Sequence, residues 1–177
     1  MDRRTVIKSY FAISAGIMLL PACFQEKNRS SLVLRNIKIN GDQELLLADL
    51  SEAIIPKTST PGAKELSSHL FSLRMIDDCF DPPSQKKFVD GLQQFESASR
   101  TRFGVSFSNT TDIQKMDFMK SMENKSGFSE ETLFFHDKIK ELTIESFVSS
   151  QFYLTQIHKY ELVPARFHGC FPVTQTS

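Results

Sequence analysis

The feature that most constrains the fold is the spacing of apolar residues between positions 41 and 158. Apolar side chains recur there every three or four residues, in segments bounded by proline, glycine or asparagine, which is the period of a helix with one buried face. Alternation typical of strands is weak and confined to residues 32–39, where we expect a short edge strand or an extended segment on the domain. The sequence predicts an all-α orthogonal bundle of about five helices with an extended tail from residue 160.

Capping residues and prolines predict the first two helix boundaries. Asp42 is expected to cap a first helix that Pro56 closes. Thr60 is expected to cap a second helix with Pro61 at its first position, where the missing N–H costs nothing. That helix should end before the prolines at 82–83. The two helices are therefore predicted to be joined by a short loop.

The remaining helices follow from the same signals. A third helix is expected to start at Ser84 and to end near Gly104, and either Thr110 or Thr111 is expected to cap a fourth. Residues 124–127 break the pattern. Ser129 and the two acids after it should open the fifth and longest helix, because acidic residues complement the positive end of the helix dipole.

The N-terminus has the arrangement of an export signal. Arg3, Arg4 and Lys8 precede an uncharged stretch, residues 10–20, that is about half the roughly 20 residues a membrane-spanning helix needs. The arginine pair resembles a twin-arginine signal, although arginine pairs also occur in general secretory signals. Residues 20–23 resemble a lipobox, in which cleavage leaves Cys23 carrying acyl chains. We therefore expect a signal peptide over 1–22, a lipidated tether over 23–40 and the helical domain over 41–177.

Export changes how the cysteines are interpreted. With Cys23 acylated, Cys79 and Cys170 form an even pair in an oxidising compartment. We predict a disulfide between them; two free buried thiols are the alternative. His168 and Cys170 supply at most two ligands, whereas a structural zinc needs four, so no metal site is predicted.

Composition and motifs exclude several kinds of function. The 21 basic residues balance the 21 acidic ones, so the chain lacks the basic surplus that meets nucleic-acid phosphates. There is no phosphate-binding glycine loop, Cys-x-x-Cys, His-Glu-x-x-His or nucleophile elbow. Asp77 and Asp78 diverge by about 100° on a helix and are expected to be solvated. We predict no catalytic, cofactor-binding or metal-binding residue.

Six phenylalanines fall at helical spacing and are more typical of a core than of a cofactor pocket. They are Phe88, Phe95, Phe134, Phe135, Phe147 and Phe152.

Three separated stretches resemble a known family. Residues 53–63 read Ala-Ile-Ile-Pro-Lys-Thr-Ser-Thr-Pro-Gly-Ala, residues 88–92 with 102–104 form the second stretch, and residues 160–170 form the third. Together they resemble the gluconate 2-dehydrogenase subunit 3 family, the small gamma subunit of membrane-bound sugar and sugar-acid dehydrogenases. The sequence departs from the pattern at residues 57–59, where an acid is more usual, and at Ala165, where glycine is.

The resemblance implies a subunit without a redox centre. Its partner would be a large flavoprotein of the glucose-methanol-choline type that holds FAD, with a cytochrome c subunit as a further partner. The small subunit would assist export, stability and attachment of that flavoprotein on the periplasmic side of a bacterial membrane, inner or outer. The motif positions are the candidates for facing a partner: Pro56, Thr58, Thr60, Pro61, Gly62, Tyr160, Pro164, Phe167 and Gly169.

Two other functions stay open at this stage. The chain could be a free-standing envelope lipoprotein with a binding role, or an enzyme that uses His136, His168 or Asp78 in a cleft. We also expect residues 56–63 and the tail 160–170 to lie close together, because the predicted disulfide would tie the tail to the helix that follows the loop.

Overall fold

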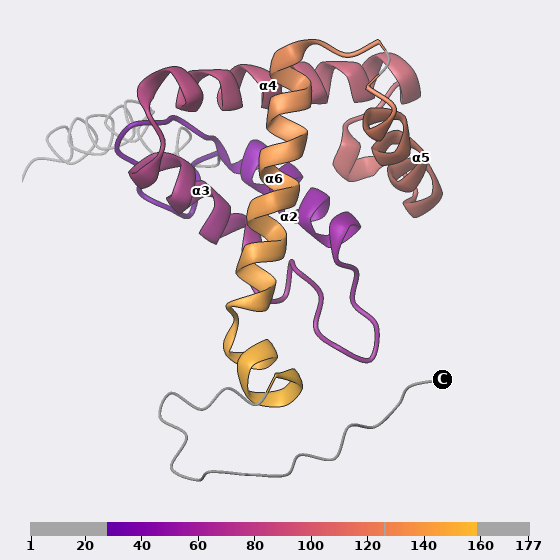
Figure 1. Ribbon diagram of the computed structural model, residues 1–177. Helices are drawn as coiled ribbons and strands as arrows, with labels where there is room; N and C mark the ends of the chain where they lie inside the picture. The colour runs from indigo at the N-terminus through magenta and orange to yellow at the C-terminus, as the bar shows by residue number, and fades with distance from the viewer. Residues whose placement is uncertain (1–27, 126, 159–177) are drawn as a thin grey trace, which may run out of the picture.

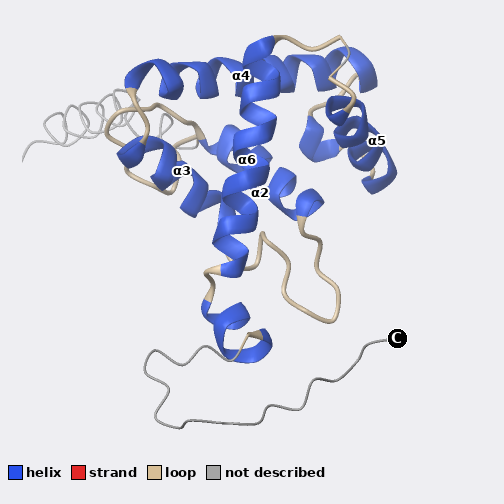
Figure 2. Cartoon of the chain, in the orientation of Figure 1, coloured by secondary structure: helices blue, strands red, loops and turns tan. Residues whose placement is uncertain are grey.

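The computed structural model describes residues 28–125 and 127–158, which form a helical bundle (Figures 1 and 2). No strand occurs among these residues, so the all-α prediction is confirmed. The α-helices are α2 (Gly41–Ile54), α3 (Ser68–Cys79), α4 (Pro82–Phe103), α5 (Asp112–Glu123) and α6 (Glu130–Val148), with a 3-10 turn η2 (Phe107–Asn109) and a π-helical turn η3 (Tyr153–Ile157).

Helices α4 and α6 make the most extensive helix–helix contact of the bundle. In Figure 1, α4 runs across one end of the molecule and α6 descends from it, with α2 and α3 packed against α6. Gly91 of α4 permits the crossing, since a β-carbon there would overlap the Glu131 carbonyl oxygen and come within 2.7 Å of the Phe135 β-carbon. The missing side chain therefore sets the distance between the two central helices.

Aromatic rings fill the space beneath this crossing. The ring of Phe95 lies 5.1 Å from that of Phe107, 5.2 Å from Phe118 and 5.4 Å from Phe135, centre to centre, in edge-to-face arrangements, a geometry that aromatic pairs favour. Phe88 and Phe135 are also wholly buried. The predicted core role is confirmed for Phe88, Phe95 and Phe135, and half-buried Phe134 packs against them; Phe147 and Phe152 are half-buried outside this core.

The first helix has a different cap from the predicted one. Asn40, and not Asp42, caps α2: its side-chain oxygen accepts the Gln43 N–H at 2.9 Å, and the Gln43 side chain accepts the Asn40 N–H at 3.0 Å. Such a reciprocal pair satisfies two free donors at once. Asp42 instead accepts a hydrogen bond from the Asn28 side chain. The helix ends at Ile54, before Pro56 as predicted.

The second helix begins later than predicted. Residues 63–67 form a turn, and α3 starts at Ser68 after Ser67, whose φ is 57°. Pro61 is thus not its first residue. Backbone bonds from Ser67 to the Lys64 carbonyl and from Ser68 to the Ala63 carbonyl hold this turn instead.

The later boundaries agree better with the sequence. Thr111 caps α5 and Ser129 caps α6, each by accepting a backbone N–H. Gly104 ends α4 with φ 75°, a conformation that suits glycine. Helix α4 begins at Pro82 rather than at Ser84. Proline is tolerated there because the N–H groups of a helix's first turn have no partner within the helix, so a missing N–H costs nothing. With 22 residues against 19, α4 and not α6 is the longest helix described.

Residues 28–40, here called the strap, precede α2 and lie extended on the bundle. The predicted edge strand is wrong: the strap has only an isolated antiparallel bridge between Arg29 and Asn40. The alternative, an extended segment on the domain, is confirmed because Ile37 and Ile39 are buried in the core. The strap therefore belongs to the fold.

Asp77 fastens the strap. Its carboxylate accepts the backbone N–H groups of Arg35 at 2.8 Å, Asn36 at 2.7 Å and Ile37 at 2.9 Å. Asp77 is wholly buried while Asp78 is exposed, so the prediction that both are solvated is wrong for Asp77. Burial by itself raises the pKa of Asp77, but the three N–H donors outweigh it and the pKa lies below 3.8.

Candidate partner-binding surface

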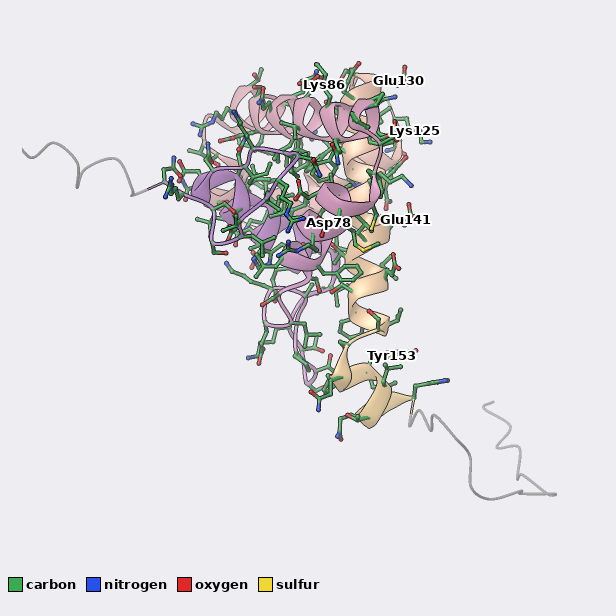
Figure 3. All side chains as sticks on the ribbon, turned by 90° about the vertical axis from the view of Figure 1, so that its left-hand side faces the viewer. Asp78, Lys86, Lys125, Glu130, Glu141 and Tyr153 are labelled. Atoms are coloured by element: carbon green, nitrogen blue, oxygen red, sulfur yellow. The ribbon has the colours of Figure 1, made fainter. Side chains whose placement is uncertain are left out.

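Two segments project from the same end of the bundle. One is the loop between α2 and α3, and the other is the end of α6 with η3, which carries Tyr153 (Figures 1 and 3). They lie side by side in both views, which differ by a quarter turn. We call this region, residues 55–67 with 146–158, the loop end.

Glu52 on the last turn of α2 shapes the loop. One carboxylate oxygen accepts the Lys57 N–H at 2.8 Å and the other accepts the Lys64 N–H at 2.9 Å. Between these anchors, the Ala63 N–H donates to the Ile55 carbonyl at 2.9 Å. The Glu52 carboxylate thus accepts hydrogen bonds from two loop N–H groups that, outside the helix, no longer have a helical carbonyl as acceptor.

Gly62 leaves room for that carboxylate. A β-carbon at Gly62 would lie 2.7 Å from the carboxylate carbon of Glu52, so any larger residue would push the Glu52 side chain away from its two donors. The requirement at this position is therefore space and not a positive φ. It explains why glycine stands at the end of the loop motif.

The tip of the loop is presented to solvent. Pro56 and Thr58 are exposed, Thr60 and Pro61 are half-buried, and Gly62 is buried. The Thr58 N–H donates to the Thr60 carbonyl at 3.0 Å, so the tip is folded on itself. A folded, exposed tip can bind a partner without losing much conformational freedom.

Ion pairs neutralise the charges around the loop. Lys64 contacts Asp49 at 2.6 Å and Lys57 contacts Glu65 at 2.9 Å. The Lys57–Glu65 pair is exposed, so it contributes little to stability, whereas Asp49 in the other pair is only 14% exposed. The pairs balance the two lysines of the loop, which leaves little positive charge to attract an anionic ligand.

An open groove of about 640 Å³ separates the two projecting segments. Leu66 and Phe71 line one wall; Ser146, Ser149, Ser150, Gln151, Phe152, Thr155 and Gln156 line the other. Its polar and apolar lining fits a peptide segment better than a small apolar molecule. The aromatic contact between Phe147 and Tyr153, 6.0 Å between ring centres, links α6 to the turn that forms this wall.

A second hollow, of about 360 Å³, borders the loop. Ala53, Pro56 and Met116 provide its apolar lining, and Met116 is 59% exposed. Ile113, one turn earlier on α5, is 83% exposed. Exposed apolar side chains of this size beside a preformed hollow are typical of a protein interface.

The sequence motifs and the structure agree only in part on this surface. The structure places Pro56 and Thr58 at the loop tip; Tyr160, Pro164, Phe167, Gly169 and Cys170 lie outside the described residues, as do Arg3, Arg4, Lys8 and Cys23. Glu52 was not anticipated, since a lone acid near a helix end carries no signal in a single sequence. Ile113 and Met116 were expected to be part of a helix, without a role at the surface.

The residues of the enzyme alternative do not form a site in the described part of the chain. His136 is buried in α6, Asp78 is exposed at the end of α3, and neither lines the groove or the hollow. His168 lies outside residues 28–158. Across the described ranges, no three potential ligands gather as a metal site would require, and no helix has the length and apolar character to span a bilayer.

Comparison with known proteins identifies the family. The profile of gluconate 2-dehydrogenase subunit 3 matches residues 41–165, well over half of the chain. The chain belongs to the gluconate 2-dehydrogenase subunit 3 family. No curated protein and no solved structure matches it.

The region shared with gluconate 2-dehydrogenase subunit 3 contains the whole bundle, the Glu52-held loop and the groove. Phe167, Gly169 and Cys170 lie beyond it, and the strap and Cys23 lie before it. The family name describes a subunit of a dehydrogenase complex. The loop end is therefore a feature of the part of the chain that defines the family.

Proposed function

We propose that this chain is a non-catalytic accessory subunit of a periplasmic, membrane-associated, FAD-dependent sugar or gluconate dehydrogenase. The observation that carries the proposal is the family match over residues 41–165. In this proposal the large flavoprotein subunit, of the glucose-methanol-choline type, holds FAD and oxidises the substrate. A cytochrome c subunit would accept the electrons.

The loop end and the neighbouring α5 face are where the large subunit would bind. Pro56, Ile113 and Met116 are exposed there, and the lysines of the loop are paired within the chain. Exposed apolar side chains gain most from being covered by another protein. Binding only the folded form of its partner, the small subunit would also stabilise the large one by mass action.

The export signal gives the small subunit a second task. FAD must be inserted in the cytoplasm, and the twin-arginine route carries folded proteins. Arg3 and Arg4 on this chain could then export the loaded large subunit with it. Acyl chains on Cys23 would hold the complex at the periplasmic side of the membrane.

The predicted disulfide has a different consequence from the one expected. Cys79 is exposed, and Cys170 lies outside the described residues. It ends α3, whereas the loop precedes the other end, about 17 Å away for a 12-residue helix. A bond to Cys170 would therefore tie the tail near the strap, and not to residues 56–63.

A pull-down tests the proposal directly. The protein, tagged at its C-terminus, is captured from membranes of its own organism, and the eluate is examined by gel and absorbance. We expect a large protein with a flavin spectrum. Arg3→Lys with Arg4→Lys should remove that protein from the envelope fraction. A colourless protein eluting alone would support a free-standing lipoprotein instead.

A further inference from the structure

We propose that the strap, residues 28–40, lies on the bilayer and fixes the orientation of the subunit at the membrane. This inference rests on lipidation of Cys23, which is part of the proposed function. The structure adds two things that a lipid anchor alone does not supply: a strap that is held firmly on the bundle only a few residues after Cys23, and a surface that can face the lipid.

The length of chain between the anchor and the strap is short. Four residues separate Cys23 from Asn28, so five Cα–Cα steps of about 3.3–3.6 Å limit the distance to about 18 Å. That is less than the diameter of a small domain. If Asn28, the first residue of the strap, is fixed to the bundle, the bundle cannot move far from the membrane or rotate freely above it.

Asn28 is fixed to the bundle by three hydrogen bonds. Its backbone carbonyl accepts the Gly41 N–H at 3.2 Å and its side-chain oxygen accepts the Asp42 N–H at 3.0 Å. The side-chain amide of Asn28 donates to the Asp42 carboxylate at 2.9 Å. These bonds join the strap to the first turn of α2, so the lipid attachment must lie within the reach of four residues from this point.

Further along, carboxylates of two helices hold the strap. Glu44 of α2 accepts hydrogen bonds from the Ser30 hydroxyl at 2.7 Å and the Ser31 hydroxyl at 2.6 Å. Asp77 of α3 accepts three backbone N–H groups, as described above. The strap is thus hydrogen-bonded to both α2 and α3 along its length. Its orientation is therefore fixed relative to both helices.

The outer side of the strap suits a lipid headgroup region. Val33 is 86% exposed, and Arg35 and Lys38 are exposed too. The strap contains three basic residues and no acidic one. The neighbouring carboxylates of Asp42 and Glu44 accept hydrogen bonds from the strap itself. An acyl anchor needs a second attraction for stable binding, and basic residues near an anionic leaflet provide one.

The location of the strap leaves the partner-binding surface free. In Figure 1 the strap, in indigo, lies at one side of the bundle with α3, whereas α5 lies at the other side and the loop end projects elsewhere. With the strap on the lipid, Ile113 and the loop tip would face away from the bilayer. The membrane and the large subunit would therefore not compete for the same surface.

Photocrosslinking from two matched positions tests the orientation. The full-length protein, exported and lipidated in its own organism, carries p-benzoylphenylalanine in place of Val33 or of Ile113. The pair is matched because the two residues are 86% and 83% exposed. Cells are grown with radioactive phosphate to label phospholipids, irradiated, and the protein is purified under denaturing conditions. A third position, Thr58, reports contact with the large subunit.

We expect position 33 to capture labelled lipid several-fold more than position 113, and Cys23→Ser to abolish the difference. Equal labelling at 33 and 113 would overturn the orientation, and an unacylated Cys23 in the mass spectrum would overturn its premise. Capture of a large protein at position 58 tests the proposed function separately. Lipid at neither position together with a protein crosslink at 58 would refute this inference alone.

Discussion

Gly91 lies against the main chain of Glu131 where α4 crosses α6, with no space between them for a side chain. Gly91→Ala should therefore separate the central helices, since the atom it meets is a backbone carbonyl that cannot rotate away. Overpacking of this kind costs about 1–3 kcal/mol, and we expect a fall in melting temperature of several degrees in thermal unfolding followed by circular dichroism.

Gln93→Ala is the matched control for this change. Gln93 lies two residues along the same helix and is exposed, so alanine there tests helix propensity without touching α6. We expect its melting temperature to stay near that of the wild type. A Gly91→Ala protein as stable as the Gln93→Ala protein would mean that the two helices can move apart without loss.

Adjacent aspartates should differ sharply in their effect on stability. Asp77→Asn replaces the acceptor of three backbone N–H groups in a wholly buried position, whereas Asp78 is exposed beside Arg74. Leaving buried donors unsatisfied costs about 1–3 kcal/mol. Urea unfolding should show that loss for Asp77→Asn and almost none for Asp78→Asn. Faster amide exchange at residues 35–37 would identify release of the strap as the cause.

The same carboxylate predicts a loss of stability in acid. The pKa of Asp77 lies below 3.8 in the native state, so the unfolded chain binds the proton first as the pH falls. Stability from this group is present above pH 3.8 and declines as the pH falls through the native pKa. The free energy of unfolding of Asp77→Asn should change less with pH in this range than that of the wild type, and an identical slope would contradict this account.

Two histidines predict a second dependence at milder pH. Burial lowers the pKa of His136 and of His69 below 6.5, so as the pH falls the unfolded chain takes up protons on these side chains, near pH 6.5, before the native protein does. Stability should therefore be complete above that pH and should fall as the solution becomes more acidic. Titration of the imidazole signals by NMR checks the direction of each pKa.

His136→Gln separates the two contributions. Nε2 of His136 has no hydrogen-bond partner among the described residues, and its Nδ1 is 3.4 Å from the Asp137 carboxylate. We expect the variant to lose part of the pH dependence and keep the part due to His69. A wild-type slope in His136→Gln would assign the effect elsewhere.

The cysteine pair is tested on the exported protein. Non-reducing peptide mapping should join Cys79 to Cys170, a bond that closes a loop of about 90 residues and would stabilise the fold by about 4 kcal/mol on the chain-entropy model. Cys79→Ser should then lower both the yield and the melting temperature, and Cys170→Ser should do the same. Unchanged values in both variants would indicate free thiols.

How far the sequence could predict this structure depends on how local each determinant is. The caps at Thr111 and Ser129 and the glycine at 104 were predictable because each satisfies donors or backbone angles within a few residues. The helical period likewise predicted the buried phenylalanines Phe88 and Phe95.

The determinants that were missed act across the chain. Asp77 accepts hydrogen bonds from residues about forty positions away, and no local sequence pattern indicates that contact. Pro61 has the local pattern of a helix start, but the Glu52 carboxylate, brought to residue 64 by the fold, holds that segment in turns. Capping patterns are weak priors that tertiary contacts override. The exposed apolar surface at Met116 could not be predicted either, because helical spacing alone does not show which apolar side chains pack into the core and which stay exposed.

Glu52→Ala should weaken partner binding far more than it weakens the fold. The change removes the acceptor for the Lys57 and Lys64 N–H groups, which are in an exposed segment where water can replace it, so the helices should stay intact. The loop tip would lose its fixed shape, and ordering it on binding would cost about 0.5–1.5 kcal/mol for each side chain immobilised.

Co-purification of the large subunit is the readout for Glu52→Ala, with circular dichroism as the measure of folding. Glu141→Ala is the control, because Glu141 is an exposed acid on α6 outside the loop end that pairs with the Lys138 side chain. We expect several-fold less large subunit with Glu52→Ala and a wild-type amount with Glu141→Ala. If Glu52→Ala retains the full amount while amide exchange at residues 57–64 is faster, the loop is not the binding element, and the α5 face with Ile113 and Met116 becomes the surface to test.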